Sequence, residues 1–274
     1  MTICVAVKIA EGLVMAADSA SMLEGTIDTP QGTQRGVVQT FSFANKVSRI
    51  LNYPIGIMSW GIGSISDRSI QSLIMEFEYS YPSLGHSHDY KVKDVADSIL
   101  EFIKERYNET FPETSPPGGQ RPALGLFVGG YSSGQFFAES YEYRFPKYKD
   151  WKIIRPDNPD GRPSFGADWF GQNDPLRRLI KGISAPALSK LIDMGADQKI
   201  VQQWVDDSVA EFPLIFDGMP IQDAIDFANF AVQVTIGCFR FGPGAPLCGG
   251  DVDIAIITPD TFQWAQRKQW AIKE

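Results

Sequence analysis

The sequence predicts an α+β fold of four layers, an αββα sandwich in which two antiparallel β-sheets pack face to face and helices cover both outer sides. Runs of β-forming residues alternate along the chain with groups of amphipathic helical stretches. Because an amphipathic helix pair buries its apolar stripe against a sheet, the helices belong on the outer faces. With 43% hydrophobic residues the chain can build a substantial core, and no repeat or low-complexity linker divides it. We therefore expect a single domain over residues 1–274.

The first half of the chain is expected to begin with a β-hairpin. Two β-rich runs flank Ala10-Glu11-Gly12, and a glycine at the third loop position would supply the positive φ of a three-residue turn. A polar stretch after the hairpin predicts a surface loop. Two helices follow two more strands, because apolar residues then recur three and four positions apart. We expect strands at residues 2–9, 13–19, 37–43 and 46–58, the loop at 22–35, and helices at 66–79 and 92–111.

In the second half of the chain, strands are again followed by helices. The turn Ser132-Ser133-Gly134 predicts another hairpin, and a charged, proline-rich connection follows it. Three helical stretches and two closing strands complete the chain. We expect the hairpin strands at 123–131 and 135–145, the connection at 146–163, the helices around 175–195, 197–212 and 221–239, and the last strands at 251–257 and 261–267.

Composition disfavours several classes of function. The 25 basic and 33 acidic residues give a formal charge of -8, the wrong sign for a nucleic-acid partner. No run of 18 uncharged apolar residues predicts a membrane span, and the first residues do not resemble a signal peptide. The widely spaced Cys4, Cys238 and Cys248 form neither a disulfide framework nor a CxxC metal pattern. These features fit a cytoplasmic protein.

Histidine-based and cofactor-based chemistries are also disfavoured. The only histidines, His86 and His88, share one loop, and no GxSxG elbow accompanies them. With Asp89 they make only a weak signal for a metal. Gly61-Ile62-Gly63 resembles half of a dinucleotide fingerprint, but Ser66 stands where the third glycine is needed. We therefore expect no metal and no other cofactor.

A threonine near the chain start permits a hydrolytic chemistry that needs no histidine. Thr2 becomes the first residue once Met1 is removed, as is usual before a small residue. Its hydroxyl is then a nucleophile, and its own α-amino group, with a pKa of about 8, can act as the base from the adjacent carbon.

Asp18 and Lys46 are the charged residues that we expect beside Thr2. If the hairpin turn is centred on the middle loop residue, Thr2 lies opposite Ala20 and Asp18 lies opposite Cys4, on the face and at the edge where Thr2 sits. A one-residue change of register would move Asp18 to the other face. A carboxylate at the end of so apolar a strand needs a partner. Lys46 is the candidate, because it begins a strand after an apolar run.

These segments resemble a known family. TICVAVKIAEGLVMAADSAS is similar to the start of mature proteasome β-subunits and of the bacterial Anbu (ancestral β-subunit) group, in which a threonine, an apolar strand, a glycine turn and a sequence like Ala-Ala-Asp-Ser recur. Residues 45–50 (NKVSRI) resemble the family's lysine strand. Residues 56–61 (GIMSWG) resemble its glycine-containing oxyanion-hole segment. The order of elements also agrees, so the resemblance implies an N-terminal-nucleophile (Ntn) hydrolase fold.

The resemblance also implies a role for each site residue. Thr2 would be the nucleophile, Lys46 the cation that lowers the pKa of its hydroxyl, and Asp18 the anion that fixes Lys46. Backbone donors at Trp60 or Gly61 would hold the oxyanion. The expected activity is threonine-type hydrolysis of a peptide or another amide by a homo-oligomeric ring or spiral, with an ATPase as a possible partner.

Two departures from the family leave an alternative open. The family's Asp-x-x-Ser-Gly-Gly, which supports the amino group, falls on residues 245–250 (APLCGG), so Cys248 and Gly249 stand where serine and glycine are expected and the aspartate is absent. A second supporting serine would lie within residues 165–168, which contain none. The alternative is a non-catalytic structural subunit in which Thr2 is an ordinary strand residue. Retention of Asp18 and Lys46 favours the enzyme, because a scaffold does not need this buried pair.

Overall fold

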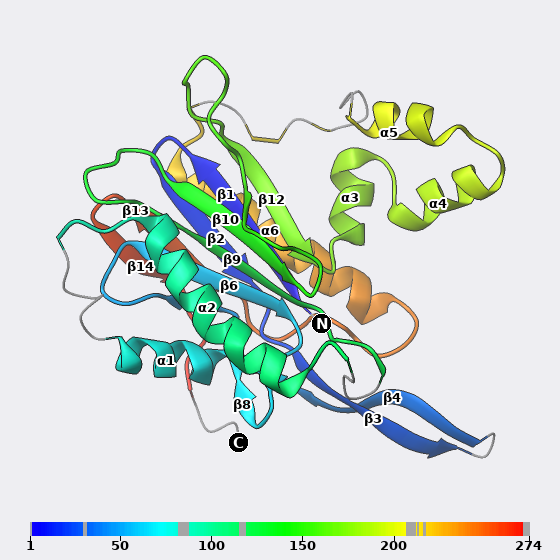
Figure 1. Ribbon diagram of the computed structural model, residues 1–274. Helices are drawn as coiled ribbons and strands as arrows, with labels where there is room; N and C mark the ends of the chain where they lie inside the picture. Colours follow the sequence, from blue (N-terminus) through cyan, green and yellow to red (C-terminus); the bar gives the residue numbers. More distant parts are fainter. Residues whose placement is uncertain are drawn as a thin grey trace.

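The computed structural model describes residues 2–29, 32–81, 88–114, 119–206, 212, 214–215 and 218–270. These residues form a mixed α+β fold with two five-stranded sheets, two small two-stranded sheets and six helices (Figure 1). The strand order is β12-β1-β2-β13-β14 in the first large sheet and β11-β10-β9-β6-β5 in the second. Every neighbouring pair in both sheets is antiparallel.

The elements have the following bounds. The first large sheet contains β1 (Ile3–Ile9), β2 (Gly12–Ala17), β12 (Gly166–Gly171), β13 (Asp253–Thr258) and β14 (Thr261–Gln266). The second contains β5 (Val47–Arg49), β6 (Ile55–Gly61), β9 (Leu124–Gly130), β10 (Glu139–Phe145) and β11 (Lys152–Ile153). The small sheets pair β3 (Ser21–Thr29) with β4 (Gly32–Phe41), and β7 (Ser64–Ile65) with β8 (Arg68–Ser69). The helices are α1 (Ile70–Ser80), α2 (Val92–Thr110), α3 (Asp174–Lys181), α4 (Ala185–Asp193), α5 (Gln198–Asp206) and α6 (Ile221–Phe241).

Side-chain alternation along β1 divides its residues between two apolar clusters. The odd-numbered residues Ile3, Val5 and Val7 pack in a cluster with residues of α6 and α3. The even-numbered Cys4 and Ala6 belong to a cluster that includes residues of β6 and β9 from the other sheet. A third cluster packs α1 and α2 on the second sheet. The two faces of β1 therefore contribute to different clusters, one shared with α3 and α6 and the other with β6 and β9.

The N-terminal hairpin forms, but the predicted register is wrong by one residue. Ile9 pairs with Gly12 and Cys4 pairs with Ala17, so the loop has two residues and not three. Gly12 is not among the glycines with positive φ. A Cβ added there would lie 2.9 Å from Ile221 Cδ1 and 3.0 Å from a backbone oxygen of β13. Close packing against α6 and β13, and not turn geometry, favours a glycine at this position.

The surface loop predicted at residues 22–35 is also wrong. Most of this stretch belongs to β3 and β4, which pair with each other in a long hairpin. Figure 1 shows this hairpin projecting away from the two large sheets. Because neither strand joins a large sheet, the stretch lacks the apolar alternation by which a half-buried strand is recognised.

Several other boundaries differ from the predictions. The expected strand at 46–58 is divided into β5 and β6, with Leu51 at φ 55 in the turn between them. The stretch around 175–195 is divided into α3 and α4, because Gly182 ends the first helix in the left-handed region and Ser184 caps the second. The short edge strands β11 and β12 were not predicted from the sequence. Among the described helices, none has the length and apolar character needed to cross a bilayer.

Candidate functional site

A buried ion pair connects the first and second large sheets. Asp18 directly follows β2, and Lys46 directly precedes β5. The Lys46 Nζ atom lies 2.7 Å from Asp18 Oδ1. The two residues are only 8% and 1% exposed, respectively. The structure therefore brings together the two charged residues that the sequence analysis selected.

The Asp18 carboxylate accepts hydrogen bonds on both oxygens. Oδ1 accepts from Lys46 and from the backbone N–H of Ile3, at 3.0 Å. Oδ2 accepts from the N–H of Gly249 at 2.9 Å and from that of Ala20 at 3.3 Å. Three backbone donors and one ammonium group stabilise the ionised carboxylate and fix its orientation.

Asp18 reaches Lys46 because the chain leaves β2 before this residue. Cross-strand pairing now places Asp18 beside Ile3, whose carbonyl oxygen accepts from the Asp18 N–H at 3.3 Å. Ile3 points toward α6, so a regular strand would turn Asp18 toward α6 as well. However, β2 ends at Ala17. The chain after this residue leaves the strand, and the carboxylate turns to Lys46 instead.

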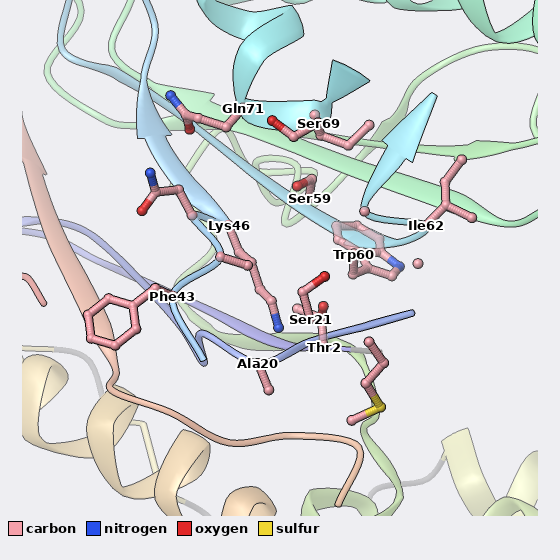
Figure 2. Close-up of a pocket in the computed structure, with 16 residues that line it drawn as sticks. Thr2, Ala20, Ser21, Phe43, Lys46, Ser59, Trp60, Ile62, Ser69 and Gln71 are labelled. Atoms are coloured by element: carbon pink, nitrogen blue, oxygen red, sulfur yellow. The ribbon is translucent and has the colours of Figure 1, made fainter. Parts of the chain in front are cut away.

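Thr2 and Lys46 line the same cavity, which has a volume of about 280 Å³. Its walls come from residues 20–22, 43–46, 59–63 and 69–71. Thr2 directly precedes β1 and is only 5% exposed. Figure 2 shows the Lys46 side chain running toward Thr2 and Ser21, with its nitrogen at the end nearest them. A hydroxyl and an ion-paired ammonium thus line one small cavity.

The backbone of β6 directs a donor toward this cavity. The Ser59 N–H donates to the Lys46 carbonyl oxygen on the β5 side, whereas the Ile62 N–H donates to Ala123 on the β9 side. Because alternate N–H groups of a strand point to the same neighbour, the Gly61 N–H points with that of Ser59, and the Trp60 N–H points toward β9. Gly61 also requires a glycine: its φ is 97°, and an added Cβ would lie 2.2 Å from the Ala123 carbonyl oxygen.

The loop containing Cys248 and Gly249 contacts the ion pair through its backbone. Besides the bond from Gly249 to Asp18, the Ser19 N–H donates to the Gly249 carbonyl oxygen at 3.0 Å. The Ser19 hydroxyl donates to the Asp251 carbonyl oxygen at 2.6 Å. The fully buried Ser19 therefore holds this loop against Asp18. Ser19 was not predicted as a site residue, because its only signal in the sequence is its place directly after Asp18.

The two thiols near the site are poor nucleophiles. Burial, reinforced by the charge of Asp18, raises the pKa of the Cys248 thiol to about 12. Burial likewise raises the pKa of the Cys4 thiol, which donates to the Ser59 carbonyl oxygen. Because the reactive species is the thiolate, neither thiol is an effective nucleophile near neutral pH.

The segment in which the resemblance placed a second supporting serine, residues 165–168, does not lie beside Thr2. Residues 166–168 pair with residues 6–8, at the end of β1 farthest from Thr2. The other end of β12 lies at Thr2, where the Gln172 N–H donates to the Thr2 carbonyl oxygen at 2.7 Å. Sequence patterns did not predict β12, so its direction along β1 could not be used.

The described residues contain no group of three or more His, Cys, Asp or Glu side chains arranged to hold a metal ion. His88 belongs to the described part of the chain, whereas His86 of the weak metal motif lies outside it.

No protein-family model matches the sequence, and no curated protein matches it. Among solved structures, the chain is similar to Anbu (ancestral beta-subunit) from Yersinia bercovieri, with a TM-score of 0.48 and 14% sequence identity. The match covers 93% of this chain and 80% of the other.

Proposed function

We propose that the protein is a threonine-type amide or peptide hydrolase with Thr2 as its nucleophile. In this proposal residues 1–274 form one domain with the four-layer αββα arrangement of Ntn hydrolases. The observation that carries it is the buried contact of 2.7 Å between Lys46 and Asp18 in a cavity that Thr2 also lines. Burying two charges is costly, and a purely structural contact could be replaced by apolar packing at little loss. Chemistry at Thr2 provides a reason to keep the pair.

The mechanism requires removal of Met1, which lies outside the described residues. The freed α-amino group of Thr2 takes the proton of its hydroxyl as Oγ1 attacks the substrate carbonyl carbon. Lys46 stabilises the negative charge that develops on Oγ1, and Asp18 holds Lys46 in place. The backbone N–H of Gly61 points toward the β5 side and that of Trp60 toward β9, so Gly61 is the better candidate for the donor to the oxyanion.

The tetrahedral intermediate then expels the amine, which receives the proton from the α-amino group. An ester between Thr2 and the acyl group remains. Water attacks this ester, giving one proton to the α-amino group. Collapse of the second intermediate releases the carboxylic acid and returns the proton to Thr2 Oγ1, so no cofactor is needed.

Intact-mass measurement combined with covalent labelling tests this function. The active protein should lack the mass of Met1, and an epoxyketone peptide, which reacts with both the hydroxyl and the amine of an N-terminal threonine, should add once. Thr2→Ser should still be labelled, whereas folded Thr2→Ala should not. Unprocessed protein that neither reacts nor hydrolyses any amide would contradict the proposal.

A non-catalytic subunit of a ring or spiral is the second candidate, and one feature favours it. The chain has Ala245 and Cys248 where an acid and a hydroxyl would support the amine, and the buried Cys248 thiol supplies no charge. Under either function we propose a cytoplasmic homo-oligomer. If the protein is a hydrolase, an ATPase is a possible partner that delivers substrate. Exposed apolar residues of α4 and α5, such as Leu191, Ile200 and Trp204, support assembly.

A further inference from the structure

A second cleft lies where the two large sheets end. β5 is the last strand of the second sheet, and β14 is the last strand of the first. The cleft, which we call the edge cleft, has a volume of about 370 Å³ and is lined by residues 47–49, 71, 78, 262, 264 and 267. Sites for small molecules usually have volumes of roughly 300–1,000 Å³. The edge cleft is therefore large enough for a small ligand.

Two arginines without an acidic partner line the edge cleft. Arg49 donates to the side-chain oxygen of Asn52 at 3.3 Å, and the Arg267 guanidinium group lies over the Trp264 ring, 4.6 Å from its centroid. Within the described part of the chain, neither arginine forms an ion pair with an acidic side chain. The edge cleft is therefore a local concentration of positive charge on a protein whose formal charge is -8.

Glu78 is the one acidic residue among those that line the edge cleft, all of which the structure describes. Its Oε1 accepts a hydrogen bond from the Leu51 N–H at 2.6 Å, so its carboxylate is held by the turn after β5. Two guanidinium groups and one carboxylate leave a surplus of one positive charge. This surplus suits a ligand that carries a single negative charge.

Buried contacts fix the backbone on which each arginine stands. Arg49 belongs to β5, which pairs with β6. Arg267 directly precedes Lys268, whose side chain forms a buried ion pair with Asp253. The Lys268 N–H also donates to the second carboxylate oxygen of Asp253, at 2.9 Å. Burial of an ion pair is costly, and here it anchors the chain after β14, which presents Arg267 to the edge cleft.

Aromatic rings form the apolar part of the wall. Phe262 and Trp264 lie on the same face of β14, and both are partly buried against the cluster that contains Val47. Their rings meet at a steep angle, with centroids 5.3 Å apart. Because Arg267 lies over the Trp264 ring, a positive group and an aromatic surface adjoin each other. This arrangement suits a ligand that has a negative end and an apolar body.

We propose that the edge cleft binds a carboxylate attached to an apolar group. Arg49 and Arg267 hold the carboxylate, and Phe262 and Trp264 contact the apolar part. A planar guanidinium group can donate two parallel hydrogen bonds to a carboxylate. The single charge of a carboxylate balances the surplus of the cleft, whereas a phosphate monoester carries about -1.5 to -2 at pH 7. A small organic acid and the C-terminal end of a peptide share this chemistry. The proposal does not depend on hydrolysis at Thr2.

Calorimetry with matched ligands tests this proposal. The Kd of 3-phenylpropionate should be at least about tenfold lower than that of its uncharged amide, which cannot form charge-assisted hydrogen bonds. Acetate, which lacks the apolar body, and phenyl phosphate, which carries more charge, should both bind more weakly. Acetyl-Ala-Ala-Phe and its C-terminal amide form a second pair, which tests a peptide end as the source of the carboxylate.

Substitutions locate the binding. Arg49→Gln and Arg267→Gln should each raise the Kd of 3-phenylpropionate by about tenfold. Glu78→Gln keeps an oxygen acceptor for its backbone partner but removes a negative charge, so it should lower the Kd by about threefold. Arg240→Gln is the matched control, because Arg240 is an exposed arginine that lies over the Phe241 ring outside the edge cleft; it should leave the Kd unchanged. Urea unfolding shows that each variant is folded.

The outcomes are distinct. A preference for the acid over its amide in either pair, lost in both arginine variants, supports the proposal. Equal binding of acid and amide in both pairs, or binding that neither arginine substitution weakens, would overturn it. Tighter binding of phenyl phosphate would overturn the choice of a carboxylate. Thr2→Ala should bind 3-phenylpropionate as tightly as the unsubstituted protein, because Thr2 does not line the edge cleft. Weaker binding by this variant would contradict a separate site.

Discussion

Substituting Asp18 and Lys46, singly and together, separates the contribution of the buried pair to folding stability from its role in hydrolysis. Lys46→Met removes the ammonium but leaves the carboxylate with three backbone N–H donors. Asp18→Asn leaves the ammonium without a carboxylate. In addition, the asparagine NH₂ group replaces one of the two carboxylate oxygens, and each of these oxygens accepts a hydrogen bond from at least one backbone N–H. In either orientation of the amide, the NH₂ group therefore faces another donor. The structure therefore predicts that the aspartate substitution is the more damaging one.

The expected magnitudes follow from this difference. Removing one partner of a buried ion pair costs roughly 3 to 5 kcal/mol of unfolding free energy. We expect about 3 kcal/mol for Lys46→Met and about 5 kcal/mol for Asp18→Asn. The double variant no longer contains an unpaired ammonium, so it should lose about 5 kcal/mol and not the roughly 8 kcal/mol of two independent losses. The coupling between the two residues is then about 3 kcal/mol.

Urea unfolding, with the slope of each transition checked, measures the stability cycle. The exposed pair Lys93 and Asp97, whose side chains are 43% and 51% exposed, is the matched control. The same substitutions there should each cost less than about 1 kcal/mol. Additive losses at the buried pair, or a greater loss for Lys46→Met than for Asp18→Asn, would refute the reasoning.

Hydrolysis by the folded variants completes this test. Lys46→Met should lower kcat/KM by about a hundredfold or more, the scale of one lost electrostatic contact to the transition state. Asp18→Asn should also lower it, and the double variant should lose little more than Lys46→Met alone, because residues that act as a unit give non-additive losses. Full activity in both folded single variants would rule out the proposed role of the pair.

Three further outcomes are expected. Gly61→Ala should lower the urea midpoint strongly, because the φ of Gly61 is 97° and the added Cβ meets the Ala123 carbonyl oxygen. Gly63→Ala should have a smaller effect, because the nearest atom to its added Cβ belongs to the Ser21 side chain, at 3.2 Å. Equal effects of the two substitutions would contradict this prediction. Burial raises the pKa of Tyr131 to about 12, above the value of about 10 in the unfolded chain, so stability is lost as pH rises past 10. Tyr131→Phe should spare about 1 kcal/mol of this loss at pH 11; an unchanged alkaline limb of the stability curve would count against it. Light scattering at micromolar concentration should show an oligomer, and a monomer would contradict the proposed assembly.

Local sequence patterns were sufficient to predict a helix or strand where that element has one buried face. The helix predicted at 92–111 is α2, Val92–Thr110, because apolar residues at helical spacing face the second sheet along its whole length. The same pattern failed for residues 22–35. There β3 and β4 pair mainly with each other, and backbone hydrogen bonds between two strands leave no apolar alternation in the sequence.

By itself the sequence determined the residue types of the candidate site: a threonine before the first strand, a carboxylate at the end of an apolar strand, and a lysine after an apolar run. Only the tertiary structure decided their geometry. The predicted register was off by one, yet Asp18 meets Lys46 because β2 ends at Ala17 and the Gly249 loop packs against the carboxylate. Gly249 is 231 residues away from Asp18 along the chain. Such contacts depend on how the sheets and loops pack, and no local pattern in the sequence specifies them.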